Sequence, residues 1–213
     1  MRHNGASPVA LGFRAGRGGS VVVALAADGR EPRLALSTFL VTAADGDRLS
    51  LEPYRLAAEM VRHAGGDVGP EVAAVVAEGR QRQNDIAAKG LDDILRRLRD
   101  TGYAPAAGAL LINRAGWITD LLQYSLGSPE HPAVAEGLAV RDAVRSACAR
   151  CRIELAEFDE KSLAEIAPMR LNLSPAAADL ALKALGKSAG PPWRKEQKLA
   201  CLSAWVVAKE GLS

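Results

Sequence analysis

The chain has 213 residues, 48% of them hydrophobic and 24% charged, which is the composition of a globular domain large enough to bury a full core. Its net charge of +2 excludes a strongly basic nucleic-acid-binding domain, but not a weaker electrostatic interaction with nucleic acid. Three cysteines, and apolar runs too short to cross a membrane, lead us to expect a cytoplasmic protein with reduced thiols.

The first pattern in the chain is a strand, a glycine-rich turn and a second strand between Pro8 and Ala27. Residues 1–7 before it are expected to be a flexible polar tail. The glycines lead into the strand Val21–Ala26 and not into a helix, so they indicate a hairpin and not a dinucleotide phosphate loop. A turn over Asp28–Pro32 and a third strand over Arg33–Ala43 then complete an antiparallel meander.

Helical patterns follow the meander, first over Tyr54–His63 and then from Pro70 to about Arg99. Gly79 and Gly90 each weaken the second helix by roughly 1 kcal/mol relative to alanine, so we expect a bend or break in its middle. The polar run Arg80–Asp85 is interpreted as a solvated helix face, with a stripe facing nucleic acid as the alternative.

The second half of the chain alternates strands and helices. A wholly apolar strand that ends in a polar residue is typical of a strand buried on both faces. Ser174 and Pro175 form a helix start, as N-cap and first helical residue. In order, we predict a strand over Ala107–Asn113, a short amphipathic segment over Trp117–Gly127, a helix from Ser128 to about Arg152, a strand over Ile153–Phe158, an ambiguous segment over Leu163–Leu173, a helix from Pro175, a linker over Gly186–Pro192 and a last helix over Trp193–Glu210.

Two motifs invite a chemical interpretation. Cys148 and Cys151 have the C-x-x-C spacing of redox and zinc sites, but they lie near the end of a predicted helix and lack further ligands nearby. We therefore interpret them as inert thiols. His131, beside Glu130, has the chemistry of an acid–base group, although a surface histidine at a helix start is the simpler interpretation.

The predicted element order is that of the ribonuclease H-like fold, and four segments resemble RuvC-type Holliday-junction resolvases. Ala10–Gly16 reads A-L-G-F-R-A-G where the family has roughly I-L-G-I-D-P-G. Leu111–Asn113 falls where the family's fourth strand ends in a glutamate, and Glu136–Arg141 resembles the small-residue helix that follows it. Arg194–Ala200 stands in place of the family's D-x-x-D-A-L-A helix.

The resemblance implies the ribonuclease H-like fold, but the residues at the family's catalytic positions argue against the family's activity. RuvC-type enzymes cut phosphodiesters with two divalent metals held by four carboxylates. The matching positions here are Arg14, Asn113, Arg194 and Gln197, and none of them is a carboxylate. Glu196 is one residue off, which on a helix turns a side chain about 100° away.

We therefore predict a single ribonuclease H-like α/β domain over residues 8–213, with a mixed sheet of an antiparallel three-strand meander plus two parallel strands, flanking helices and a helical insertion at about 51–100. The expected function is non-catalytic binding of nucleic acid or of a protein partner, with no catalytic residue, metal or cofactor, no membrane association and an open oligomeric state. The alternative is a divergent metal-dependent nuclease that uses Asp120, Glu136 or Glu196.

A final expectation concerns the degenerate pocket formed by the four matching positions. Arg14 is expected to point into it, near Asn113 and the last helix, with Glu196 or Glu136 as countercharge. A guanidinium held there repels metals and suits an anion. The alternative is an Arg14 side chain that points to solvent beside the hairpin.

Overall fold

The computed structural model describes residues 6–27, 31–113 and 117–211. Within these ranges the chain forms one sheet and eight helices. The strands are β1 (Ser7–Gly16), β2 (Gly19–Ala26), β3 (Arg33–Val41), β4 (Tyr103–Ile112) and β5 (Glu154–Asp159). The helices are α1 (Arg48–Leu51), α2 (Pro53–His63), α3 (Pro70–Asp100), α4 (Leu121–Leu126), α5 (His131–Arg150), α6 (Leu163–Leu171), α7 (Pro175–Ala189) and α8 (Lys195–Gly211).

The sheet has the strand order β3-β2-β1-β4-β5. β1, β2 and β3 pair antiparallel, whereas β4 is parallel to β1 and β5 is parallel to β4. This is the ribonuclease H-like arrangement, and it confirms the predicted mixed sheet. The glycine-rich turn is a hairpin as predicted, because Gly16 pairs with Gly19 and Gly18 takes a φ of +71° that glycine adopts without strain.

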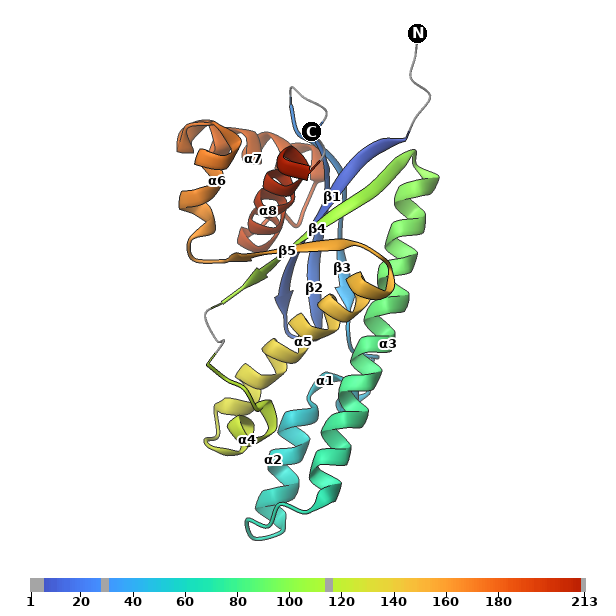
Figure 1. The fold of residues 1–213 in the computed structure, drawn as a ribbon, viewed down its shortest axis with the longest axis vertical. Coiled ribbons are helices and arrows are strands. Elements are labelled where there is room, and N and C mark those ends of the chain that lie inside the picture. Colours follow the sequence, from blue (N-terminus) through green and yellow to red (C-terminus); the bar gives the residue numbers. More distant parts are fainter. Residues whose placement is uncertain (1–5, 28–30, 114–116, 212–213) are drawn as a thin grey trace.

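Each face of the sheet is covered by its own set of helices (Figure 1). Val9, Leu11 and Phe13 alternate along β1 and pack with α3 and α5. The residues between them face α6, α7 and α8, and Ala10 belongs to that second core. At Gly12 the approach is so close that a Cβ atom would lie 1.8 Å from the carbonyl oxygen of Ala200 on α8. Glycine at this position therefore allows α8 to sit directly on β1.

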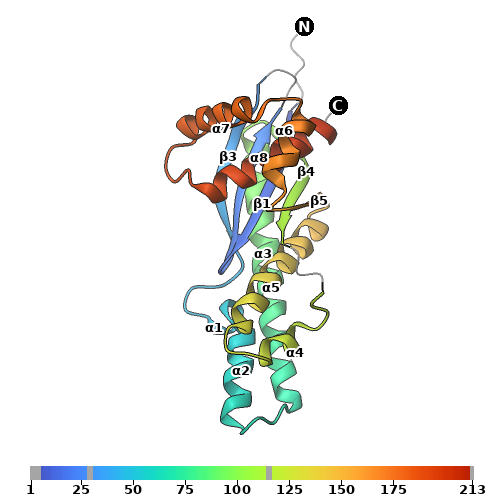
Figure 2. The same cartoon turned by 90° about the vertical axis from the view of Figure 1, so that its left-hand side faces the viewer.

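A helical extension projects beyond one end of the sheet, as Figures 1 and 2 show. It consists of α1, α2 and α4 with the first halves of α3 and α5. Its small core is separate from the two sheet cores and includes Tyr54, Val72 and Ala135. The predicted insertion over residues 51–100 supplies α2 and α3, so part of it builds the extension while the second half of α3 covers the sheet.

Of the bend or break expected in the long helix, the break is wrong, because α3 runs without interruption from Pro70 to Asp100. Its glycines serve packing. A Cβ at Gly79 would lie 2.4 Å from the carbonyl oxygen of Leu49, and one at Gly90 would lie 2.9 Å from Leu40. The glycines let α1 and β3 approach the helix closely, and this contact offsets their weak helix propensity.

The solvated-face interpretation of the run Arg80–Asp85 is wrong for its inward-facing members. Gln83 is 1% exposed and donates to the carbonyl oxygen of Ser50 at 2.8 Å. Arg80 pairs with Asp142 of α5 at 2.6 Å. The polar side chains of this run therefore hold helices together, because α3 is packed on more than one side.

Smaller boundary differences have local causes. The segment 163–173 contains the helix α6, and α7 continues into the predicted linker as far as Ala189. Gly186 leaves space for the Trp193 ring, whose Nε1 donates to the carbonyl oxygen of Leu182 at 3.0 Å. Ser174 caps α7 as predicted. The predicted tail and the turn at 28–32 lie largely outside the described residues, although Ser7 already belongs to β1.

The cysteines agree with the interpretation as inert thiols. All three are free, and Cys148 and Cys201 are buried. Burial raises the pKa of both of these thiols to about 12, so neither is a thiolate near neutral pH. In the part of the chain that the structure describes, no helix is both long and apolar enough to cross a bilayer.

Candidate functional site

The parallel strands β1, β4 and β5 end at the same edge of the sheet. Arg14 is in register with Leu111, and Ile112 is in register with Asp159. The residues at or just after these strand ends therefore lie close together. The carboxyl ends of parallel strands are where α/β domains commonly place their functional side chains.

Arg14 forms the centre of this edge. Its Nε and Nη2 atoms each donate to one carboxylate oxygen of Glu160, both at 3.2 Å, in a bidentate pair. Its Nη1 atom lies 3.8 Å from a carboxylate oxygen of Glu196 on α8. The Arg14 side chain is only 27% exposed. It therefore does not extend into solvent but is held between the end of β5 and the start of α8.

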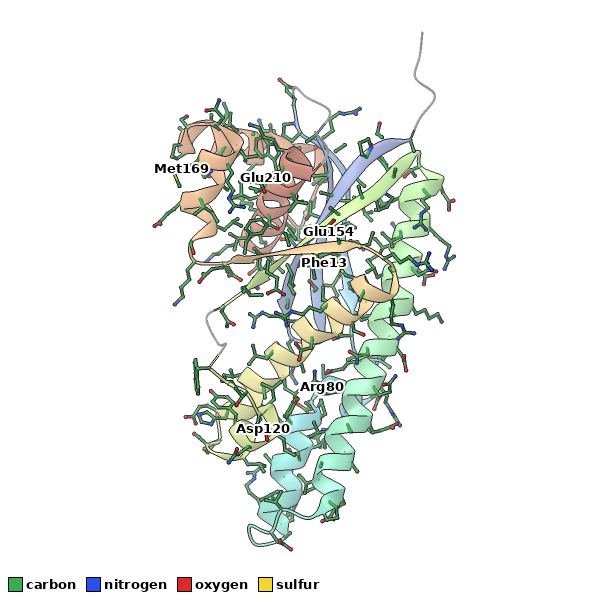
Figure 3. The ribbon with its side chains drawn as sticks, in the orientation of Figure 1. Phe13, Arg80, Asp120, Glu154, Met169 and Glu210 are labelled. Atoms are coloured by element: carbon green, nitrogen blue, oxygen red, sulfur yellow. The ribbon has the colours of Figure 1, made fainter. Side chains whose placement is uncertain are left out.

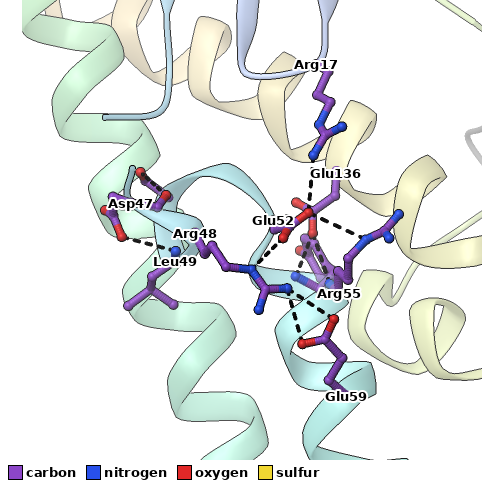
Figure 4. Close-up of polar contacts among 10 residues, drawn as sticks. Arg17, Asp47, Arg48, Leu49, Glu52, Arg55, Glu59 and Glu136 are labelled. Carbon is purple, nitrogen blue, oxygen red and sulfur yellow. Dashed lines mark hydrogen bonds and ion pairs between the residues drawn. The ribbon is translucent and has the colours of Figure 1, made fainter. Parts of the chain in front are cut away.

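Of the two alternative countercharges, Glu196 is the one beside Arg14, and Glu136 lies elsewhere. Glu136 belongs to α5 in the helical extension, and its Oε1 atom accepts from the backbone N–H groups of Tyr54 at 2.7 Å and Arg55 at 3.1 Å (Figure 4). It therefore caps the start of α2. Burial raises the pKa of Glu136 to about 7.

Asn113 turns away from Arg14 toward α5. Its Oδ1 atom accepts from Nη1 of Arg141 at 2.9 Å. Arg141 is half-buried, and this burial lowers the pKa of its guanidinium. The negative charges of Glu160 and Asp142 act on this pKa in the opposite direction, and the positive charges of Arg145 and Arg14 lower the pKa further. The end of β4 thus meets an arginine of α5, on the other side of the edge from α8.

Arg194 and Gln197 serve the start of α8. The backbone N–H of Arg194 donates to Oε1 of Gln197 at 2.9 Å, which is the backward bond of a capping box. The Arg194 side chain is exposed. Among the described residues, no hydrogen bond or ion pair joins Arg14 to Asn113, Arg194 or Gln197. Of the four matched positions, only Arg14 makes the central contacts of the edge.

The three acids named as an alternative catalytic set lie in three places. Asp120 caps α4, with Oδ1 accepting from the backbone N–H of Gln123 at 2.9 Å. Glu136 caps α2, and Glu196 lies beside Arg14. Over residues 6–27, 31–113 and 117–211, no group of three or more histidine, cysteine or acidic residues has the arrangement of a metal site.

Sequence reasoning missed Glu160 and Arg141, the two side chains that connect the matched positions to the rest of the site. A signal for Glu160 was available, since it follows the predicted strand Ile153–Phe158 almost directly, as Asn113 ends its own strand. Polar residues at neighbouring parallel strand ends are expected to converge. Arg141 was named only as part of a helix rich in small residues, and nothing in its spacing predicts the contact with Asn113.

An exposed aromatic group lies beyond the end of β4. The Trp117 ring is 71% exposed and packs edge-on against Tyr124, with ring centroids 5.5 Å apart. Tyr124 in turn stacks on His131 at 4.0 Å, and Nδ1 of His131 lies 2.8 Å from the carbonyl oxygen of Tyr124. His131 thus supports the aromatic group at the start of α5.

The sheet order, with helices on both faces, defines a ribonuclease H-like domain. No protein-family model matches the chain. A comparison with curated proteins also finds no match.

Among solved structures, the chain is similar to Thermus thermophilus RuvC, with 14% identity over 96% of this chain and 95% of that one, at a TM-score of 0.48. It is also similar to T. thermophilus RuvC in complex with a Holliday junction substrate, with 13% identity over 95% and 93% of the two chains, at a TM-score of 0.47. At this identity the activity of those proteins does not transfer to this chain.

Proposed function

We propose that this ribonuclease H-like domain is a non-catalytic protein that binds nucleic acid, and that Arg14 occupies the place where RuvC-type enzymes hold their metal ions. The observation that carries the proposal is the contact of Arg14 with both Glu160 and Glu196 at the carboxyl edge of the sheet. A divalent metal needs carboxylates whose charge is available to it. Here one fixed cation already lies between the two acids and repels a second.

Two features support nucleic acid as the partner. Arg17, in the hairpin that follows β1, has a side chain that is 75% exposed, and Arg194 is exposed at the start of α8. Trp117 offers a rigid, solvent-facing ring, since Tyr124 packs against it. Arginines that contact phosphates and an aromatic ring that stacks on bases are the usual elements of single-strand recognition without sequence preference.

Metal binding tests the non-catalytic part of the proposal. Calorimetry with Mg²⁺ and Mn²⁺ is expected to show no binding to the wild-type protein and measurable Mn²⁺ binding to Arg14→Asp, which adds a carboxylate beside Glu160 and Glu196. Arg17→Asp is the matched control, because it makes the same substitution at an exposed position of the same hairpin and is expected to bind no metal.

Cleavage is the result that favours the nuclease alternative. The protein is incubated with linear and branched DNA in the presence of each metal. Activity that persists through purification and is lost on substitution of Asp120, Glu136 or Glu196 contradicts the proposal, as does tight binding of either metal by the wild-type protein.

Nucleic-acid binding is tested by fluorescence anisotropy with a labelled single-stranded oligonucleotide at low and raised salt. The affinity is expected to fall with salt, and Trp117→Ala to weaken it by about 1 kcal/mol or more, which is roughly fivefold to tenfold. Met169→Ala is the control, because Met169 is 72% exposed but lies on α6. If the oligonucleotide does not bind at low salt, the nucleic-acid part is wrong and a protein partner becomes the working hypothesis.

A further inference from the structure

A cavity of about 750 Å³ lies at the junction between the sheet edge and the helical extension. The end of β4, helices α3 and α5 and the start of α4 enclose it. Two of the residues that line the cavity, Arg80 on α3 and Asp120 at the start of α4, are labelled in Figure 3. Its volume is that of a small-molecule site. It shares Asn113 with the set of matched positions, but it does not include Arg14.

The lining of the cavity is part apolar and part polar. Aliphatic side chains from three helices contribute to it, namely Val76, Leu122 and Leu138. Polar side chains of α5 and the end of β4 also line it, with Arg141 beside Asn113. A ligand that suits such a lining has an apolar body and a polar end.

The lining of the cavity carries three arginines and three carboxylates, and all but one of the arginines are paired with a carboxylate. Asp142 accepts from Arg80 at 2.6 Å and from Arg145 at 2.7 Å, and Arg145 also pairs with Glu157 at 2.5 Å. These two arginines and two carboxylates leave no net charge. Asp120, the remaining carboxylate of the cavity, uses Oδ1 to cap α4.

Arg141 is the exception. Its Nη1 atom donates to the neutral Asn113, and its Nε atom is buried without a hydrogen-bond partner. No carboxylate in the described parts of the chain forms an ion pair with it. A half-buried guanidinium without an ion-pair partner is unfavourable, because the charge has lost water and the carboxylates of Glu160 and Asp142 act on it without direct contact. An anion from outside the chain would supply what is missing.

We propose that this cavity binds a small organic molecule with an apolar or aromatic body and a single anionic group, a carboxylate or a phosphate monoester, held by Arg141. One unpaired cation suits one anionic group, and the nearby carboxylates of Asp142, Glu157 and Asp120 repel a polyphosphate. The site goes beyond the proposed function, since it depends neither on Arg14 nor on nucleic acid.

Calorimetry with three small molecules that share a phenyl ring tests the proposal. Phenyl phosphate and benzoate carry the anionic group, whereas benzamide is uncharged. The wild-type protein is expected to bind at least one anionic probe with a Kd below about 10 mM and to bind it more tightly than benzamide. Arg141→Gln is expected to weaken that binding by about tenfold or more.

Two further variants separate binding from folding. Arg150→Gln makes the same change on the same helix, at an arginine that pairs with Asp85 outside the cavity, and is expected to leave affinity unchanged. Ala77→Leu fills the apolar wall from an exposed helical position that tolerates leucine, and is expected to weaken binding while Arg141 stays intact.

The proposal is overturned by any of three outcomes. The wild-type protein binds neither anionic probe, or Arg141→Gln binds them as the wild type does, or Arg150→Gln and Arg141→Gln lose affinity equally. Competition with a single-stranded oligonucleotide identifies another source of the anion. If the oligonucleotide depends on Arg141 and neither small probe binds, the cavity belongs to the nucleic-acid surface and the small-molecule proposal is wrong.

Discussion

The sheet and the helical extension are held together by different interactions. The sheet buries two continuous apolar cores, and most of β2 and the middle of β1 are buried between α3 and α5 on one face and α8 on the other. The extension has only a small core around Tyr54 and Val72. Its helices are joined by ion pairs and by one buried carboxylate, Glu136, at the start of α2. Apolar burial responds little to pH and salt, whereas charged contacts respond to both. The sheet and the helical extension should therefore lose stability under different conditions of pH and salt.

The largest effect is expected in the sheet, from Gly12→Ala. The new Cβ atom would lie 1.8 Å from the carbonyl oxygen of Ala200, so α8 has to move away from β1. We expect a loss of about 3 kcal/mol or more in the free energy of unfolding, measured by urea denaturation.

Gly137→Ala is the control for that substitution. Gly137 lies in α5 with no atom near the position of an added Cβ, so alanine should stabilise the protein by about 0.5 to 1 kcal/mol. If Gly12→Ala is as stable as the wild type, the close packing of α8 on β1 is contradicted.

The second effect concerns the extension and pH. The pKa of Glu136 is about 7 in the folded protein against an ordinary value of 4.5, so the folded state holds its proton more tightly than the unfolded state. The stability that this group contributes is therefore complete below about pH 4.5 and lost as pH rises to about 7. The full change is at most about 3 kcal/mol.

Glu136→Gln keeps an oxygen for the backbone N–H groups of Tyr54 and Arg55 but cannot ionise. Its stability should vary less with pH than that of the wild type. Hydrogen exchange measured from pH 5 to 8 distinguishes local opening at the start of α2 from any effect of pH on the sheet. Equal pH slopes in both proteins would refute the role given to Glu136.

The smallest effect is expected for Asp142→Asn. Asp142 pairs with Arg80 of α3 and Arg145 of α5, but all three side chains are about one third exposed, or somewhat more, so water screens them. We expect a loss of about 1 kcal/mol, smaller again at high salt. A double-mutant cycle with Arg80→Gln measures the share due to that pair, and a coupling energy of zero would show that the contact does not stabilise the extension.

Sequence patterns predict the sheet better than the extension. The alternation in β1, the turn glycines and the apolar run of β4 each follow from a local requirement, so these patterns predicted the strands, while the arrangement of the sheet came from the resemblance to the ribonuclease H-like fold. The glycines of α3 were misjudged because their reason is a contact with α1 and β3, distant in sequence. A propensity scale does not contain that contact.

The same distinction applies to the site. Arg14 and Asn113 could be nominated because they match carboxylate positions of the family that the chain resembles, and the structure places both near the ends of parallel strands. Their partners could not be paired in advance, because Glu160 is 146 residues from Arg14 and Arg141 is 28 residues from Asn113. The pairing of charges depends on the tertiary packing of α5 and α8, which residue spacing does not express.

The contact between β1 and α8 also has a consequence for synthesis on the ribosome. The strand β1 emerges before the helix that seats on Gly12, because that helix spans residues 195–211 and follows every strand of the sheet. Until then the face that carries Ala10, Val23 and Leu25 has no cover from α8. The nascent chain therefore presents an apolar surface until α8 has emerged, and a chain that stops before Lys195 should require a chaperone or aggregate.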